Sequence, residues 1–349
     1  MRIKSLAVAV ICCIALTGCA SDASRRPQTQ RTVFVMDTAA SVKGTASDVD
    51  LAIDMLTDLS GRFDRYDEKS EIYSVNNRLN AAISDYTAEL IEQSVRLGGI
   101  YGGKVSIFAG DITDAWNITG DRDLPSDKPA VPAVPSEEIL SDALKSFRDT
   151  SFSLDTMSFT DENGSIDVGS VAKGYALDKI EERLGDDCCI VSMTSSVILH
   201  GKKSGGGKFS VSIRDPADGE GSLGTLHTNE CFLSTSGGYE RFFEIDGNQY
   251  IHIFDLSSGM PCETDLTSVT VICGIKKDAA QQKMGGGILS DFLSTLIFIE
   301  GTEGLGKYMA DPLLGIIAVT DKNMIYVSGN VDFSIAEDCG YKLEVWKNE

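Results

Sequence analysis

The chain has 349 residues, with 31 lysines and arginines against 52 aspartates and glutamates, so its formal net charge is −21. A negative surface repels phosphate groups, which argues against nucleic acid or anionic lipid headgroups as partners. After removal of an N-terminal signal about 330 residues would remain, enough for one large domain or two intimately packed domains.

The N-terminus has the features of a secretory signal. Arg2 and Lys4 precede an apolar run over residues 6–16, which is shorter than the roughly 20 apolar residues of a membrane-spanning helix. The segment before Cys19 resembles a bacterial lipobox, whose cysteine becomes lipidated; an ordinary signal with a chance cysteine is the alternative. We expect a signal peptide over residues 1–18, lipidation of Cys19 and a flexible tether over residues 19–32. The expected location is the extracytoplasmic face of the cell membrane.

Hydrophobic spacing predicts the elements that follow. A strand over residues 33–36 is followed by amphipathic helices over 49–66 and 86–101, a four-proline surface loop over 120–135 and a helix capped by Ser136. The chain then turns strand-rich, and an apolar helix and a late hairpin end the pattern. Strands are predicted at residues 190–193, 209–213, 242–245, 252–254 and 268–273, the helix at 288–299 and the hairpin at 316–319 with 324–327.

Residues 165–184 predict an anion site. A strand over 165–168 carries Asp167, and small residues and Lys173 lead into a helix over 175–184. Backbone N–H groups point outward at the start of a helix, where the helix dipole also favours negative charge. The P-loop spacing is absent. A strand–turn–helix corner with a surface lysine is the alternative reading of the same residues.

Three further stretches contain candidate functional residues. Asp291, Ser294 and Thr295 share one face of the apolar helix, and oxygen ligands of this kind suit a hard cation such as Mg²⁺. His252 is one of three histidines and would share a strand face with Phe254, although such a histidine is more often structural than a base. Residues 234–237 (Ser-Thr-Ser-Gly) fit either a ligand-contacting loop or an ordinary turn. The cysteines outside the signal and lipobox show no CxxC spacing, which argues against a cysteine metal site.

Taken in order, these motifs resemble the bacterial FAD:protein FMN transferase family from residue 35 to about residue 304. Residues 167–175 are similar to the family's Asp-Leu-Gly-Gly-Ile-Ala-Lys-Gly-Tyr, and residues 291–295 to its Asp-Ala-x-x-Thr. Residues 36–38, 63–76, 234–237, 251–261 and 268–271 match further family motifs.

The resemblance implies an α+β domain over residues 33–345, with mixed or antiparallel sheets, flanking helices and an FAD cleft between two intimately packed parts. It also implies Mg²⁺-dependent transfer of the FMN moiety of FAD to a Thr or Ser hydroxyl of an exported or membrane flavoprotein, with release of AMP. His252 would help to deprotonate the acceptor hydroxyl. The implied FAD contacts are Met36, Tyr66, Asp167, Lys173 and Phe254; the implied Mg²⁺ ligands are the Ser170 carbonyl, Asp291 and Thr295, with Ser294 at a position where some members have a second acid.

Several positions depart from the family pattern. Asp37 and the pair Thr194-Ser195 replace glycines, Ser106 replaces an aspartate and Leu256 replaces a proline. An irregular loop is expected over residues 281–287, before the metal helix. Two other functions therefore stay open, a Mg²⁺-dependent FAD hydrolase that yields FMN and AMP, and a non-catalytic flavin-binding lipoprotein.

Overall fold

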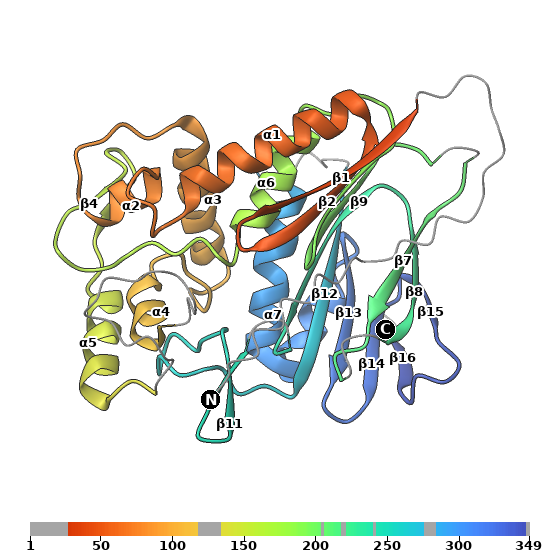
Figure 1. Ribbon diagram of the computed structural model, residues 1–349. Helices are drawn as coiled ribbons and strands as arrows, with labels where there is room; N and C mark the ends of the chain where they lie inside the picture. The colour runs from red at the N-terminus through yellow and green to blue at the C-terminus, as the bar shows by residue number, and fades with distance from the viewer. Residues whose placement is uncertain are drawn as a thin grey trace.

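A nine-stranded sheet forms the centre of the computed structural model, which describes residues 27–117, 134–203, 206–217, 221–239, 242–275 and 284–346 (Figure 1). Its neighbouring strands pair antiparallel, except for the parallel pair β14 and β16. In spatial order the strands are β1 (Gln28–Val35), β2 (Thr38–Thr45), β5 (Cys189–Met193), β6 (Ser196–His200), β9 (Cys231–Gly237), β12 (Leu266–Gly274), β13 (Leu314–Thr320), β14 (Met324–Ser328) and β16 (Lys342–Trp346).

Both faces of this sheet are covered. Helices α1 (Ala46–Phe63), α6 (Ala172–Glu181) and α7 (Gly286–Met309) pack on one face and close the main hydrophobic core (Figure 1). A small antiparallel sheet packs on the other face around a second core, because alternate side chains of each strand point to opposite sides. Its strands are β15 (Asp332–Ile335), β8 (Ser222–Thr228) and β7 (Phe209–Arg214).

The remaining helices gather at one end of the molecule (Figure 1). These helices are α2 (Glu71–Asn76), α3 (Asp85–Ile100), α4 (Gly110–Trp116) and α5 (Glu137–Arg148). Two short hairpins lie outside the larger sheets, formed by β3 (Phe152–Ser153) with β4 (Ser158–Phe159) and by β10 (Phe242–Ile245) with β11 (Asn248–Ile251). Trp116 and Phe254 belong to a third hydrophobic cluster, between the helices α4 and α5 and the segment that follows β11. The expected α+β class, with antiparallel and mixed pairing, is confirmed.

Most predicted elements are present. The helices expected at 49–66 and 86–101 are α1 and α3, and Ser136 caps α5 by accepting a hydrogen bond from the Ile139 N–H at 3.3 Å. Helix α7 contains the predicted 288–299 segment and extends beyond it, with a break at Gly301, where φ is 67°. The late hairpin is the antiparallel pair β13 and β14. Within the described part of the chain, every helix is too short or too polar to cross a membrane.

Four predictions were wrong in their local structure. The strand expected at 165–168 is a single bridge between Ala109 and Ser165, and the strand expected at 252–254 has already ended at Ile251. The 234–237 stretch is neither loop nor turn, because it lies inside β9 between β6 and β12. The tether cannot extend to residue 32, because β1 begins at Gln28 and pairs with β2.

Other expectations fall wholly or largely beyond the described residues. These are the signal peptide, Cys19 and the tether up to residue 26, nearly all of the proline-rich loop, and residues 281–283 of the irregular loop.

Candidate functional site

Asp291 is a buried carboxylate in the second turn of α7, and its exposed fraction is 5%. Its Oδ2 accepts a hydrogen bond from the Gly174 N–H at 2.9 Å, and its Oδ1 accepts one from the Ser196 hydroxyl at 3.0 Å. Burial raises the pKa of Asp291, against the positive charge of Lys173 and these two hydrogen bonds. Both hydrogen-bond donors are neutral, so the Lys173 charge is what partly compensates this buried carboxylate.

The predicted hydroxyl ligands lie one turn further along α7. Ser294 is fully buried, donates to the Asp291 carbonyl at 3.0 Å and bonds the Ser236 hydroxyl at 2.9 Å. Thr295 is half-buried, and its Oγ1 lies 3.1 Å from Ser236 Oγ. The three predicted α7 residues therefore share a face, as expected, and β9 supplies Ser236 as the partner of Ser294 and Thr295.

The turn before α6 and the first turn of that helix contain three of the predicted site residues. Asp167 accepts a hydrogen bond from the Gly169 N–H at 2.8 Å, and half-buried Ser170 lies between Asp167 and the start of α6. Val171, the N-cap of α6, makes no side-chain capping bond. Lys173 stands in the first turn, and its charge acts on Asp291. The structure thus brings the Asp291 carboxylate to the first turn of α6, beside Lys173, where the helix dipole favours negative charge.

Arg65 is a functional candidate to which the sequence assigned no role. Its side chain is 9% exposed, and one Nη donates to Asp114 at 3.0 Å and to the Ser165 hydroxyl at 2.6 Å. The other Nη lies 3.6 Å from Asp167 Oδ2. Arg65 stands inside the matched 63–76 motif, but its partners come from segments far along the chain. It therefore fixes Asp167, a predicted FAD contact, against α4.

Tyr66 lies beside this arginine, and its hydroxyl donates to Asp114 at 3.0 Å. Burial raises the pKa of Tyr66 although the Arg65 charge opposes the rise, so the phenol stays protonated at neutral pH. This keeps Tyr66 a hydrogen-bond donor.

Met36 and Asp37 form the two-residue turn between β1 and β2, with φ of 48° and 57°. Positive φ at both central residues is the type I′ hairpin geometry, and aspartate tolerates it better than most residues. The Met36 N–H donates to Ser60 of α1 at 3.0 Å. The turn between β5 and β6 also contains a left-handed residue, Thr194, with φ of 59°.

These two turns touch, because the hydroxyls of Thr38 and Thr194 lie 2.7 Å apart. Two of the departures from the family pattern therefore occupy neighbouring turns that the backbone accommodates.

Phe254 and His252 lie in the segment that follows β11. Phe254 is 7% exposed and stacks on Trp116, with ring centroids 5.8 Å apart, in a hydrophobic cluster distinct from the one that contains α7. His252 is half-buried in the bend after β11. The shared strand face expected for these two residues does not form.

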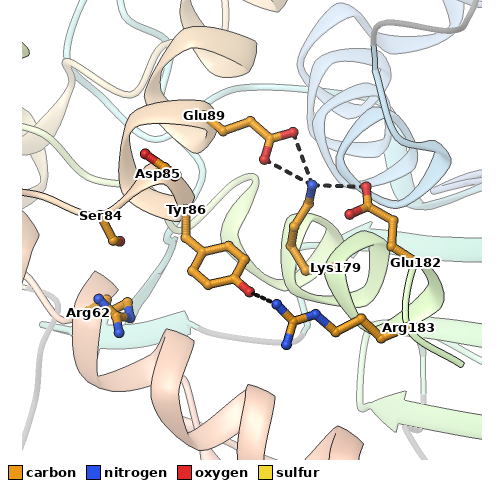
Figure 2. Close-up of a pocket in the computed structure, with 8 residues that line it drawn as sticks. All are labelled: Arg62, Ser84, Asp85, Tyr86, Glu89, Lys179, Glu182 and Arg183. Atoms are coloured by element: carbon orange, nitrogen blue, oxygen red, sulfur yellow. Dashed lines mark hydrogen bonds and ion pairs between the residues drawn. The ribbon is translucent and has the colours of Figure 1, made fainter.

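A cavity of about 430 Å³ lies among α1, α3 and α6 (Figure 2). Lys179 is 8% exposed there, and its ammonium lies 2.9 Å from both Glu89 Oε2 and Glu182 Oε1. Arg183 points at the Tyr86 hydroxyl (Figure 2). None of the predicted site residues lines this cavity, and its charges largely satisfy one another, so it is a structural junction. The FAD cleft expected between the two parts stays a prediction.

Among the described residues, no three His, Cys, Asp or Glu side chains gather closely enough to hold a metal. A metal ion at α7 would therefore need a mixed set of oxygen ligands. One carboxylate, a threonine hydroxyl and a backbone carbonyl are ligands that a hard cation accepts, and water or phosphate oxygens complete such sites.

The sequence model described as "ApbE family" matches residues 36–319. The chain belongs to the ApbE family. A FAD:protein FMN transferase from Treponema pallidum is 29% identical over 235 residues, which cover 61% of this chain and 59% of that protein. This chain thus spans about three fifths of the length of that ApbE relative.

Solved ApbE structures share the fold. The ApbE protein of Thermotoga maritima superposes with a TM-score of 0.73 at 22% identity, over 89% of this chain and 97% of that one. The flavin transferase ApbE of Vibrio cholerae gives a TM-score of 0.68 at 18% identity, over 90% of this chain and 98% of that one.

Proposed function

We propose that this chain transfers the FMN moiety of FAD to a Thr or Ser hydroxyl of an exported or membrane flavoprotein and releases AMP, in a Mg²⁺-dependent reaction. The observation that carries the proposal is the buried Asp291 carboxylate, held at the N-terminus of α6 beside Lys173. Relatives in the ApbE family that bear the name FAD:protein FMN transferase support it.

The donor set fits a magnesium ion. Asp291, Thr295 and the Ser170 carbonyl would hold it, and they supply only hard oxygen ligands. When bound, Mg²⁺ neutralises phosphate oxygens and acts as a Lewis acid. Since a single carboxylate contributes, the pyrophosphate of FAD would supply the remaining negative charge. Ser294, buried against Ser236, would support Thr295.

The chain's own residues would then position and activate the reactants. Cleavage of a pyrophosphate depends more on charge neutralisation and in-line positioning than on covalent chemistry. Lys173 and the N-terminal amides of α6 would add positive potential around the phosphates. His252 would take the proton of the incoming hydroxyl, while Met36, Tyr66, Asp167 and Phe254 would contact FAD.

The deciding experiment incubates the full-length protein with FAD and Mg²⁺, with and without a candidate acceptor, followed by mass spectrometry. Transfer predicts an acceptor that carries FMN, together with AMP. Free FMN and AMP, formed equally well without an acceptor, would instead identify a hydrolase. Unchanged FAD bound to the protein would identify a non-catalytic flavin binder.

We also propose that lipidated Cys19 anchors the protein at the extracytoplasmic face of the cell membrane, near such acceptors. Labelling of growing cells with a fatty acid should mark the wild-type protein and leave Cys19→Ser unmarked. Equal labelling of both would refute the anchor.

A further inference from the structure

Helices α6 and α7 each cap the other with a carboxylate. Asp178 of α6 accepts hydrogen bonds from the N–H groups of Gly287 and Ile288, the second and third residues of α7, at 2.7 and 2.8 Å. In return, Asp291 of α7 accepts the bond from the Gly174 N–H in the first turn of α6. Because the first N–H groups of a helix lack partners within that helix, each carboxylate satisfies donors that would otherwise be buried without partners.

The two helices also touch through glycine. A Cβ on Gly174 would lie 2.2 Å from the Gly287 carbonyl oxygen, and a Cβ on Gly287 would lie 2.2 Å from the Gly174 carbonyl oxygen. The N-cap of α7, Gly285, makes no side-chain capping bond of its own, so Asp178 caps α7 in its place. The two helices therefore meet closely through their glycines, and Asp178 supplies hydrogen bonds across the same contact.

Asp178 fixes α7 at a point close to Asp291 in the same helix. Ile288, which donates to Asp178, precedes Asp291 by three residues, less than one helical turn of about 5.4 Å. A shift of the α7 start therefore carries the Asp291 carboxylate with it. Asp178 itself is 5% exposed, and burial raises its pKa to about 7 despite the two N–H bonds, so holding it ionised costs free energy.

We infer that Asp178 is a positioning residue for the metal-binding carboxylate: it fixes the start of α7 against α6 and so places Asp291 at the N-terminus of α6. The inference rests on the proposed role of Asp291 as a Mg²⁺ ligand. Residues that orient metal ligands through hydrogen bonds commonly change metal affinity by about 10–100-fold when replaced.

The test compares Asp178→Asn with Asp265→Asn in the full chain. Asp265 is a matched control, because it caps the same helix after the Gly301 break by accepting from the Thr302 N–H at 2.9 Å. Mn²⁺ serves as the probe, and its affinity is measured by electron paramagnetic resonance of the free ion, with FAD present, beside the thermal midpoint. Asp178→Asn should bind Mn²⁺ at least about 10-fold more weakly. Asp265→Asn should keep a Mn²⁺ affinity within about twofold of wild type, although its thermal midpoint should also fall.

Equal Mn²⁺ affinities in the two variants would overturn the inference and leave Asp178 a structural cap. Should Asp178→Asn fail to fold, Gly285→Ala tests the same contact, since its Cβ would lie 2.0 Å from Asp178 Cγ and displace that carboxylate. Its control is Gly61→Ala in α1, where a Cβ meets nothing within 4 Å. Wild-type affinity in Gly285→Ala would likewise refute the inference.

The readout separates this inference from the proposed function. A wild-type protein that binds Mn²⁺ but transfers no FMN would refute the transfer reaction and leave the positioning role intact. If Asp291→Asn binds Mn²⁺ as tightly as wild type, Asp291 is not a ligand, and the positioning role falls with that assignment.

Discussion

The Gly174 N–H donates to Asp291 Oδ2 at 2.9 Å, and this bond joins two segments that are 117 residues apart in the sequence. It brings the first turn of α6, which carries Lys173, against the Asp291 carboxylate of α7. The bond also ties the geometry of the candidate site to the packing of two helices, so substitutions at the helix contact should act on metal affinity.

Replacement of Asp291 by alanine should abolish Mg²⁺-dependent turnover, because the site loses its one carboxylate ligand. The measurement is FMN and AMP formation over a range of Mg²⁺ concentrations. Glu303→Ala is the control, since Glu303 is an exposed carboxylate on the same helix. Wild-type turnover in Asp291→Ala would remove the metal assignment.

Loss of the Ser196 hydroxyl should weaken the response to Mg²⁺ without a change in FAD affinity. Ser196 is fully buried, and its hydroxyl is the side-chain donor to Asp291 Oδ1. We expect Ser196→Ala to raise the half-saturating Mg²⁺ concentration by about 10-fold. Ser290→Ala removes a buried hydroxyl that bonds Ser234 and the Gly287 carbonyl rather than the Asp291 carboxylate, and it should leave this concentration unchanged. The same response in both variants would contradict a role for Ser196 in orienting the carboxylate.

The helices were predictable because their apolar residues recur at helical spacing over many turns, as they do in α1 and α3. Strand β9 could not be predicted in the same way, because its Ser-Thr-Ser-Gly stretch has the composition of a turn. Its two serine hydroxyls are satisfied by α7, through Ser234 with Ser290 and Ser236 with Ser294, and these partners lie 56 and 58 residues away. Its threonine, Thr235, bonds Thr270 of β12. Strand β2 lacks the large alternating side chains that mark a strand, and it forms because β1 and β5 pair with it.

The candidate site was predictable where a motif is local and obscure where partners are distant. Asp291 and Thr295 share a helical face, so their spacing alone indicated oxygen ligands. Arg65 gave no such signal, since Asp114 and Ser165 lie 49 and 100 residues away. Asp178 likewise gave no local signal, because its partners at the start of α7 follow more than 100 residues later.

Glu71 should stabilise the fold above pH 4.5 and lose that effect in acid. Burial alone would raise its pKa, but hydrogen bonds from Thr87 and Ser84, with the Arg62 ion pair, lower it below the ordinary value of 4.5. A carboxyl with a lower pKa in the folded state stabilises that state above the unfolded pKa. This stabilisation disappears as the pH falls through the folded-state pKa.

Glu71→Gln should therefore lower the free energy of unfolding by about 2 kcal/mol at pH 7, the usual scale for hydrogen bonds to a charged group. The difference in the free energy of unfolding between Glu71→Gln and wild type should shrink steadily as the pH falls below 4.5. Denaturant titrations at several pH values measure this, with the exposed Glu68→Gln as control. A difference that stays constant down to pH 3 would contradict the assignment.

His252→Ala should slow FMN transfer by roughly 10²–10⁴-fold and leave FAD affinity nearly unchanged, if His252 removes the proton from the acceptor hydroxyl. FAD affinity and single-turnover transfer should be measured on the same preparation, because Phe254, a predicted FAD contact, lies two residues away. His227→Ala is the matched control, since His227 lies on β8 in the small sheet and bonds Ser210. A parallel loss of FAD affinity and transfer would indicate a structural role for His252. An unchanged transfer rate would rule out His252 as the base and leave activation of the hydroxyl to the metal or to solvent.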